Sequence, residues 1–442
     1  PAILCIDDAH LGEDALRFAH AVLRRNTLPA LIIFTVRDEA LPERPREREL
    51  LDTLPSGKLL RVGPLDRHDM ERTLDSLMQL EPALRAQVIE RSGGNPAFVV
   101  ELVRNWVERG ALTLGPGGFS VQGELAQHMP ASFGQIWSRR VDELLENHEE
   151  WRGPLELAAC LGVTVVATEW EAACQAAGVH APRGLLLALL RSSLALVEEG
   201  TMGAHWHFAH GMLREAVLAP AREAGRLPNL HRACAFALAN DPNWVDRYGR
   251  HLLAAGETDA AIDALIEGAV TAAHTGLFSR AVHAASLAEQ AIPASDPRSR
   301  RALEVRIHAA RLRGETEEAQ VHIRRLLQWA KLRRDAAAQT TALSARADLL
   351  LRTGAIEEAI EVARSAVESS VDLSGRQQAE AHSGLATAHA KAWSFRNAEA
   401  AFREAAGHDN HFYPAAYGLG RIRLDLEHAH AANRGVHRGL AR

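Results

Sequence analysis

Two neighbouring acids follow an apolar segment at the start of the sequence. Ala-Ile-Leu-Cys-Ile at residues 2–6 leads directly into Asp7 and Asp8. Such a run predicts a buried parallel strand that carries the acids to the rim of a sheet. Paired carboxylates at that place can hold a hydrated Mg²⁺ and polarise a water beside a nucleotide γ-phosphate. A strand-end turn or a helix N-cap is the plainer interpretation, because Asp is common at both.

A second apolar segment, at 31–36, ends just before Arg37. The helix expected near 12–25 makes this region a strand–helix–strand unit, whose strands pair in parallel. Arg37 is then expected on the same rim as the two acids, where its guanidinium would contact a γ-phosphate. The plainer alternative is a surface arginine paired with an adjacent acid. A short third strand is expected at 59–62.

The loop that cradles nucleotide phosphates, Gly-x-x-x-x-Gly-Lys-Ser/Thr, does not occur in the sequence. We therefore expect either the latter part of a longer ATPase or an ATPase-derived protein that no longer binds ATP. The first residue is Pro rather than Met, which favours the first expectation. ATP hydrolysis is expected only with such a loop upstream, and the chain alone is expected to be inactive.

Composition limits the classes of function. A chain of 442 residues predicts two or three domains, and its apolar content, rich in Ala and Leu, predicts helices. The net charge of −6 gives no general attraction to nucleic acid or anionic lipid. The sequence has no apolar stretch of membrane-spanning length and no signal peptide, so a soluble, cytoplasmic protein is expected. The scattered cysteines (Cys5, Cys160, Cys174 and Cys234) are expected to be buried thiols rather than disulfides or zinc ligands.

In residues 64–129 the apolar residues recur at helical spacing. Gly93 and Gly94 predict a helix end, and Asn95-Pro96 predicts the start of the next helix. Gly94, Asn95 and Pro96 could also place backbone and a proline ring against an adenine. Their geometry alone favours the ordinary helix end and start.

Residues 130–220 predict several helices followed by a β-hairpin of 194–197 with 205–208, an order that suggests a winged helix. His210 lies just past the second hairpin strand. Its imidazole could reach the β-phosphate of a bound nucleotide and hold a closed form. The plainer alternative is a buried histidine that caps the following helix.

The remaining residues, 221–442, are expected to be helical and repetitive. An alanine that opens an amphipathic helix recurs at intervals of 38, 40 and 39 residues, and a turn residue lies five positions before each alanine. These pairs are Gly276 and Ala281, Gly314 and Ala319, Gly354 and Ala359, and Trp393 and Ala398. The spacing predicts a solenoid of helical hairpins, each of which buries its apolar face against its neighbours.

The order of these motifs resembles that of the bacterial STAND-type (signal-transduction, AAA-related) ATPases. The resemblance rests on Ile-Leu-Cys-Ile-Asp7-Asp8-Ala-His10, Phe-Thr-Val-Arg37, Gly93-Gly94-Asn95-Pro96, Met129-Pro130-Ala-Ser-Phe and Phe208-Ala-His210, in that order. It implies a mainly α protein with four parts. These are part of a P-loop ATPase core with a parallel α/β sheet (1–63), a helical lid (64–129), a winged helix (130–220) and tetratricopeptide-like (TPR-like) repeats (221–442).

The resemblance also implies roles for the residues singled out above. Asp7 and Asp8 match the Walker B acids, with Asp7 at Mg²⁺, and Arg37 matches the sensor arginine. Gly94 to Pro96 match the lid motif near adenine. His210 matches the histidine that stabilises the ADP-bound state. Asp8 stands where many relatives carry Glu, which implies slow hydrolysis, suited to a switch.

The implied function is signalling or transcription regulation through ATP/ADP exchange, with a protein or small-molecule inducer bound by the repeats. The output domain of such proteins, a DNA-binding domain or a kinase, is not visible here, so no contact with nucleic acid is expected from this chain; self-association stays open. The alternative is a non-catalytic scaffold of TPR type with a degenerate ATPase remnant.

Overall fold

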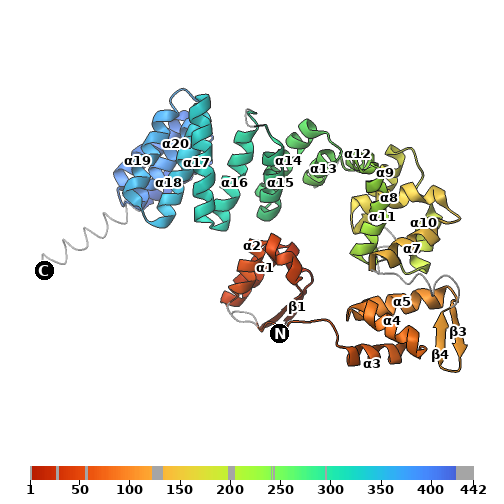
Figure 1. Cartoon of the computed structure of the whole chain (residues 1–442). Coiled ribbons are helices and arrows are strands. Elements are labelled where there is room, and N and C mark those ends of the chain that lie inside the picture. The colour runs from red at the N-terminus through yellow and green to blue at the C-terminus, as the bar shows by residue number, and fades with distance from the viewer. Residues whose placement is uncertain are drawn as a thin grey trace. The chain divides into compact units, whose positions relative to one another are not determined.

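The chain divides into two units, Pro1–Leu238 and Ala239–Arg442. The computed structural model describes residues 2–25, 29–54, 58–121, 133–197, 205–239, 241, 244–293 and 296–424. Helices dominate both units, and small sheets occur in the first (Figure 1). The prediction of a mainly α fold is therefore confirmed. No helix among the described residues is long and apolar enough to cross a membrane.

The first unit begins with the strand–helix–strand element that the sequence predicts. Strands β1 (Ala2–Ile6) and β2 (Ala30–Phe34) pair in parallel, on either side of α1 (Glu13–Arg25) in the sequence. A short helix, α2 (Pro45–Asp52), follows. The third strand expected at 59–62 is wrong, because this segment belongs to no sheet and its apolar side chains are exposed.

The next elements are three helices and a hairpin, with bounds α3 (Arg67–Leu77), α4 (Pro82–Ser92), α5 (Pro96–Glu108), β3 (Leu112–Gly115) and β4 (Gly118–Val121). Their core contains Leu74, Phe98 and Trp106, all buried. The hairpin was not predicted from the sequence. Its strands are antiparallel and are joined by residues 116–117, and Gly118 begins β4 with φ of 120°, in the region that favours glycine.

The last part of the first unit combines helices with a three-stranded antiparallel sheet in the order β5-β7-β6. Its elements are α7 (Phe133–Leu145), α8 (Arg152–Leu161), β5 (Thr164–Val166), α9 (Ala167–Ala176), α10 (Arg183–Arg191), β6 (Ala195–Val197), β7 (His205–Phe208), α11 (Gly211–Glu223) and α12 (Leu227–Leu238). The predicted helices and the β6–β7 pairing are confirmed, whereas β5 was missed. Trp206 is completely buried at the centre, edge-on to Trp170.

The last helix of the first unit, α12, lies within the region that was expected to contain the repeats. The repeats were expected from residue 221, but α12 contributes Leu230 and Cys234 to the core of the first unit, and the division of contacts falls after Leu238. Residues 129–132 of the Met-Pro-Ala-Ser-Phe motif lie outside the described residues.

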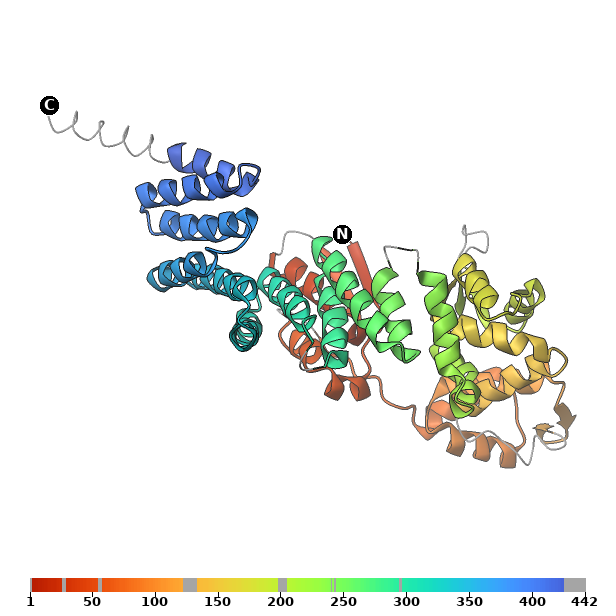
Figure 2. The ribbon, with the colours of Figure 1, turned by 90° about the horizontal axis from the view of Figure 1, so that it is seen from above.

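The second unit is a stack of helices joined by short turns (Figure 2). They are α13 (Val245–Ala254), α14 (Thr258–His274), α15 (Phe278–Ala291), α16 (Ser299–Arg313), α17 (Thr316–Arg333), α18 (Ala336–Thr353), α19 (Ile356–Ser369), α20 (Gly375–Lys391) and α21 (Phe395–His408), followed by helical residues 413–424. Each helix packs against the next along the chain. The predicted TPR-like stack is confirmed.

The repeated alanines and turn residues have the positions that the spacing predicts. Each alanine is the fourth residue of its helix and is completely buried, so two helices can approach closely there. The turn residues Gly276, Gly314, Gly354 and Trp393 have φ values of 80°, 77°, 84° and 59°. Glycine adopts this left-handed conformation without strain, whereas Trp393 does so at a cost.

Substituting two glycines of the stack should change stability in opposite directions. Gly354→Ala should lower the free energy of unfolding by about 1 kcal/mol, because a Cβ there has room but the backbone is left-handed. Gly384→Ala should raise it by about 0.5–1 kcal/mol, because Gly384 lies inside α20 with open space around it. Urea denaturation of both variants measures these changes. If both substitutions changed the free energy of unfolding equally, the left-handed backbone at Gly354 would not be the reason for glycine in the turn.

The cysteines differ from the expectation at one position. Cys160, Cys174 and Cys234 are buried thiols, as expected, but Cys5 is exposed. It lies on a face of the β1–β2 pair that also exposes Ile3, Leu31 and Ile33, since residues 3, 5, 31 and 33 alternate with less exposed neighbours. Burial raises the pKa of the Cys174 thiol to about 12.

This difference predicts a single reactive thiol in the folded protein. A thiolate is the attacking species, and Cys174 is protonated at pH 8. Ellman's reagent at pH 8 should therefore modify Cys5 quickly, and Cys5→Ser should abolish the fast phase. In denaturant, all four thiols of the wild-type chain should react. A fast phase that persists in the folded Cys5→Ser variant would contradict the described burial.

Candidate functional site

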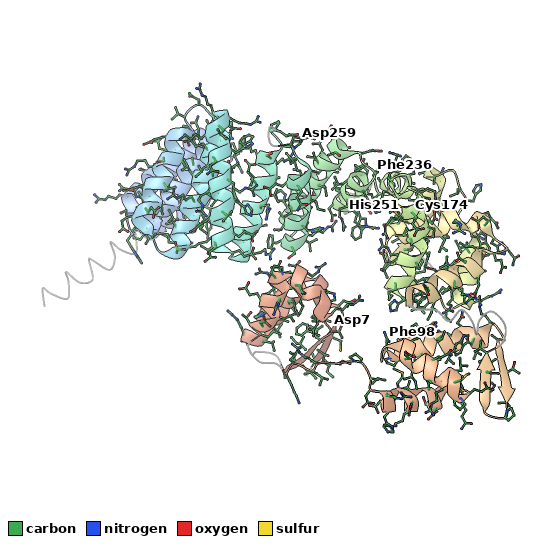
Figure 3. The ribbon with its side chains drawn as sticks, viewed as in Figure 1. Asp7, Phe98, Cys174, Phe236, His251 and Asp259 are labelled. Carbon is green, nitrogen blue, oxygen red and sulfur yellow. The ribbon has the colours of Figure 1, made fainter. Side chains whose placement is uncertain are left out.

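The first group of candidate residues lies where β1 and β2 end. Ile6 and Phe34 are paired in the parallel register, so the residues that follow them meet at one rim. The Nε atom of Arg37 lies 3.5 Å from an Oδ1 of Asp8, and Asp7 is the first residue after β1 (Figure 3). The partner of Arg37 is thus an acid across the rim rather than its sequence neighbour.

Thr35 connects the two acids, a role that the sequence analysis did not assign. The backbone N–H of Asp8 donates to Thr35 Oγ1 at 2.8 Å, and this hydroxyl donates to Oδ1 of Asp7. The next amide, that of Ala9, donates to the carbonyl of Thr35 at 2.9 Å. Asp8 is thereby held with φ of 49°, in the left-handed region. A hydroxyl residue directly after the second strand was the signal available in the sequence.

His10 supports the same rim from below the surface. Its side chain is almost completely buried, and its Nδ1 accepts a hydrogen bond from the backbone N–H of Arg37 at 3.4 Å. The same nitrogen lies 3.9 Å from Asp8 Oδ1. An accepting Nδ1 carries no proton, so this geometry requires the tautomer with hydrogen on Nε2. His10 was quoted only as part of a motif.

The rim offers the ligands that a hard cation prefers. Asp7 is exposed and the Asp8 side chain is 37% exposed; the Asp7 carboxylate lies at the Thr35 hydroxyl, and the Asp8 carboxylate lies beside Arg37. Mg²⁺ is bound in proteins by one or two carboxylates together with water and phosphate oxygens. The donor set therefore fits Mg²⁺, with the Arg37 guanidinium as a nearby cation for phosphate.

The second group begins at the junction of α4 and α5. Gly93, with φ of 56°, ends α4, and the Asn95 side chain caps α5 by accepting from the amides of Ala97 and Phe98. Gly94 has a separate reason to be glycine, because a Cβ there would lie 2.6 Å from the carbonyl oxygen of Leu65. Helix capping and close packing thus account for Gly94, Asn95 and the helix-starting Pro96 without a ligand.

His210 is the N-cap of α11. Its Nδ1 accepts from the amide of Met212 at 3.1 Å, which agrees with the plainer alternative, although the residue is exposed rather than buried. The ring also stacks on Trp137 of α7, with centroids 6.0 Å apart. Its role toward a phosphate stays a prediction.

A continuous series of contacts links His210 with α5. Trp137 lies under the guanidinium of Arg140, whose Cζ is 5.4 Å from the ring centroid. Arg140 is buried and donates to Glu101 of α5 at 2.8 Å and to the carbonyl of Ser192 at 2.6 Å. The helix that Asn95 caps is thereby joined to the histidine at α11. Sequence reasoning assigned no role to Glu101, Arg140 or Trp137.

Removing the carboxylate of the buried Glu101–Arg140 pair should destabilise the fold. Glu101→Gln should lower the free energy of unfolding by about 2–4 kcal/mol, because the Arg140 charge loses its compensation while remaining buried. Glu71→Gln, which breaks the exposed pair with Arg67, is the matched control and should cost less than about 1 kcal/mol. Urea denaturation followed by tryptophan fluorescence compares them. Similar small losses would mean that the pair does not hold α5 to α7.

Comparison with known proteins gives distant structural likenesses. No protein-family model and no curated protein sequence matches the chain. A STAND protein with a tetratricopeptide repeat sensor from Pyrococcus horikoshii aligns with 96% of this chain at 14% identity and a TM-score of 0.37. Yeast Tom70 aligns with 95% of this chain and 72% of its own at 10% identity and a TM-score of 0.33. The chain spans 65% of the length of the STAND protein, and likeness at this level does not define function.

Proposed function

We propose that the chain is the regulatory part of a nucleotide-controlled switch, with a nucleotide site at the β1–β2 rim and a ligand site on the helical repeats. The observation that carries the proposal is the meeting of Asp7, Asp8 and Arg37 at one rim, organised by the hydroxyl of Thr35. This combination of carboxylates, hydroxyl and guanidinium suits a Mg²⁺-bound polyphosphate.

Each rim residue has a distinct part in this proposal. Asp7 would hold Mg²⁺, which would supply positive charge beside the phosphates. Asp8 orients the attacking water, and Arg37 contacts the γ-phosphate. Because Arg37 is paired with Asp8, a γ-phosphate would compete with that carboxylate for the guanidinium. Occupancy of the site therefore changes the charge balance at the rim.

The rest of the first unit transmits the state of the site. In the proposal, residues 64–129 are the lid and residues 130–220 are a winged helix, with His210 favouring the ADP form. The contacts from Glu101 through Arg140 and Trp137 to His210 support coupling between these two parts. A ligand on the repeats shifts the switch only by its difference in affinity for the two forms.

The second candidate function is a scaffold whose strand–helix–strand element is only structural. It is favoured by the Asp8–Arg37 pair, in which the carboxylate and the guanidinium satisfy each other's charge. Reading the coding sequence ahead of Pro1 separates the candidates. An in-frame Gly-x-x-x-x-Gly-Lys-Ser/Thr supports the switch, and a start codon directly before Pro1 supports the scaffold.

A substitution at Asp8 tests the switch. In the protein expressed from its complete coding sequence, Asp8→Asn should slow ATP turnover at least about 100-fold, because the amide cannot activate water, while Mg-ADP binds nearly unchanged. Asp52→Asn, an exposed acid in α2, is the control and should leave turnover unchanged. Unaltered turnover in Asp8→Asn would remove Asp8 from the mechanism. Residues 1–442 alone should show no micromolar ATP binding by calorimetry.

A further inference from the structure

Three alternate helices of the second unit, α16, α18 and α20, line a groove of about 440 Å³. Short turns reverse the chain at each step, so alternate helices run in the same direction. Ion pairs from Arg300 to Asp335, at 3.2 Å, and from Arg311 to Asp348 join α16 to α18 along their length. The groove is therefore a surface that the repeat itself builds.

The uncharged lining of the groove is small and rich in hydroxyl groups. Thr341 and Ser344 of α18 face it together with Ser383, Gly384 and Thr387 of α20. None of the described residues that line it is Phe, Tyr or Trp. A nucleobase or sugar ring would find no aromatic surface to stack on. The hydroxyls of Thr341 and Thr387 donate to carbonyls of their own helices, at 3.0 and 2.8 Å, so their oxygens can accept from the amides of an extended backbone.

The charges that line the groove are mainly acidic. Glu304, Asp348 and Glu380 contribute three carboxylates, and Arg311 contributes one cation. Arg311 is already paired with Asp348. Burial, with Arg311 and His274 nearby, lowers the pKa of His308, so this ring adds no positive charge at pH 7. An anionic ligand would have to break the Arg311–Asp348 pair.

A cationic ligand can pair with Glu304 and Glu380 at a small cost in free energy. Glu304 accepts from Arg300 at 2.7 Å, and Glu380 from Arg376 at 3.1 Å, each within one helix. Such i,i+4 pairs at least partly exposed to water contribute only about 0.3–0.5 kcal/mol, so a ligand cation can join or replace the arginine. Glu304 and Glu380 stand on the outer helices of the groove, with α18 between them.

The spacing of the helices sets the length of the ligand. Packed helix axes lie about 8–10 Å apart, so α16 and α20 are separated by about 16–20 Å. Five or six residues of extended chain cover that distance at about 3.3 Å each. We propose that this groove binds an extended, non-aromatic peptide segment with cationic side chains about five residues apart. The proposal specifies the ligand of the repeats and so rests on the proposed function.

A defined peptide tests the proposal with the chain of residues 1–442. Fluorescein-labelled Arg-Ala-Ser-Ala-Ala-Arg should bind in an anisotropy titration at about 50 mM salt, where exposed charges are weakly screened. The same peptide with Glu at both ends should bind at least about tenfold more weakly, as should one with the two arginines adjacent. The double substitution Glu304→Gln and Glu380→Gln should weaken binding about tenfold. The matched control, Glu317→Gln with Glu361→Gln on α17 and α19, should change it less than twofold.

Several results would overturn the proposal. These are no binding of the spaced arginine peptide, equal binding of the acidic or clustered peptide, or equal losses in the groove and control variants. Circular dichroism and thermal melting identify any variant that is misfolded, and Glu304→Asp, which keeps the charge, should then retain most of the affinity. The titration contains no nucleotide, so its failure leaves the Asp8 experiment, and with it the proposed switch, untouched.

Discussion

The parallel pairing of β1 with β2 is the constraint on which the candidate site depends. Because Ile6 is level with Phe34, the residues after each strand meet at one rim, and Arg37 reaches Asp8 across it. The Thr35 hydroxyl then fixes the two acids relative to each other. A register shift of one residue would turn the side chains of one strand to the opposite face. The rim would then lose its acid–arginine pair.

Two features of the chain, the turns of the helical stack and the glycine at Gly94, show how backbone conformation and helix packing depend on each other. The turn residues of the stack are left-handed, and the helix after each turn buries its fourth residue, always alanine. Trp393 occupies the same turn with an exposed side chain, so the turn is imposed by the packing of its helices rather than by the residue itself. Gly94, by contrast, is required by the close approach of Leu65.

The sequence predicted those features that depend on local pattern. Apolar periodicity located β1, β2, most helices and the repeat, and strand ends located Asp8 and Arg37. The sequence-based prediction failed where tertiary contacts determine the structure. The segment at 59–62 has a strand-like composition but no neighbouring strand, and Cys5 lies on an exposed face although its neighbours are apolar. The buried partners of the site, His10 and Arg140, were missed because a charged or polar residue gives no sign in sequence that it will be buried.

The central claim is that the rim acids bind a metal–nucleotide complex, and Mn²⁺ in place of Mg²⁺ tests it most directly. Electron paramagnetic resonance of the protein from its complete coding sequence, titrated with Mn²⁺ in the presence of ADP, measures the bound cation. The account predicts a bound Mn²⁺ signal that Asp7→Asn weakens at least about tenfold, because a carboxylate ligand is lost. An unchanged Mn²⁺ affinity in Asp7→Asn would contradict it and leave the repeat stack as the functional part of the chain.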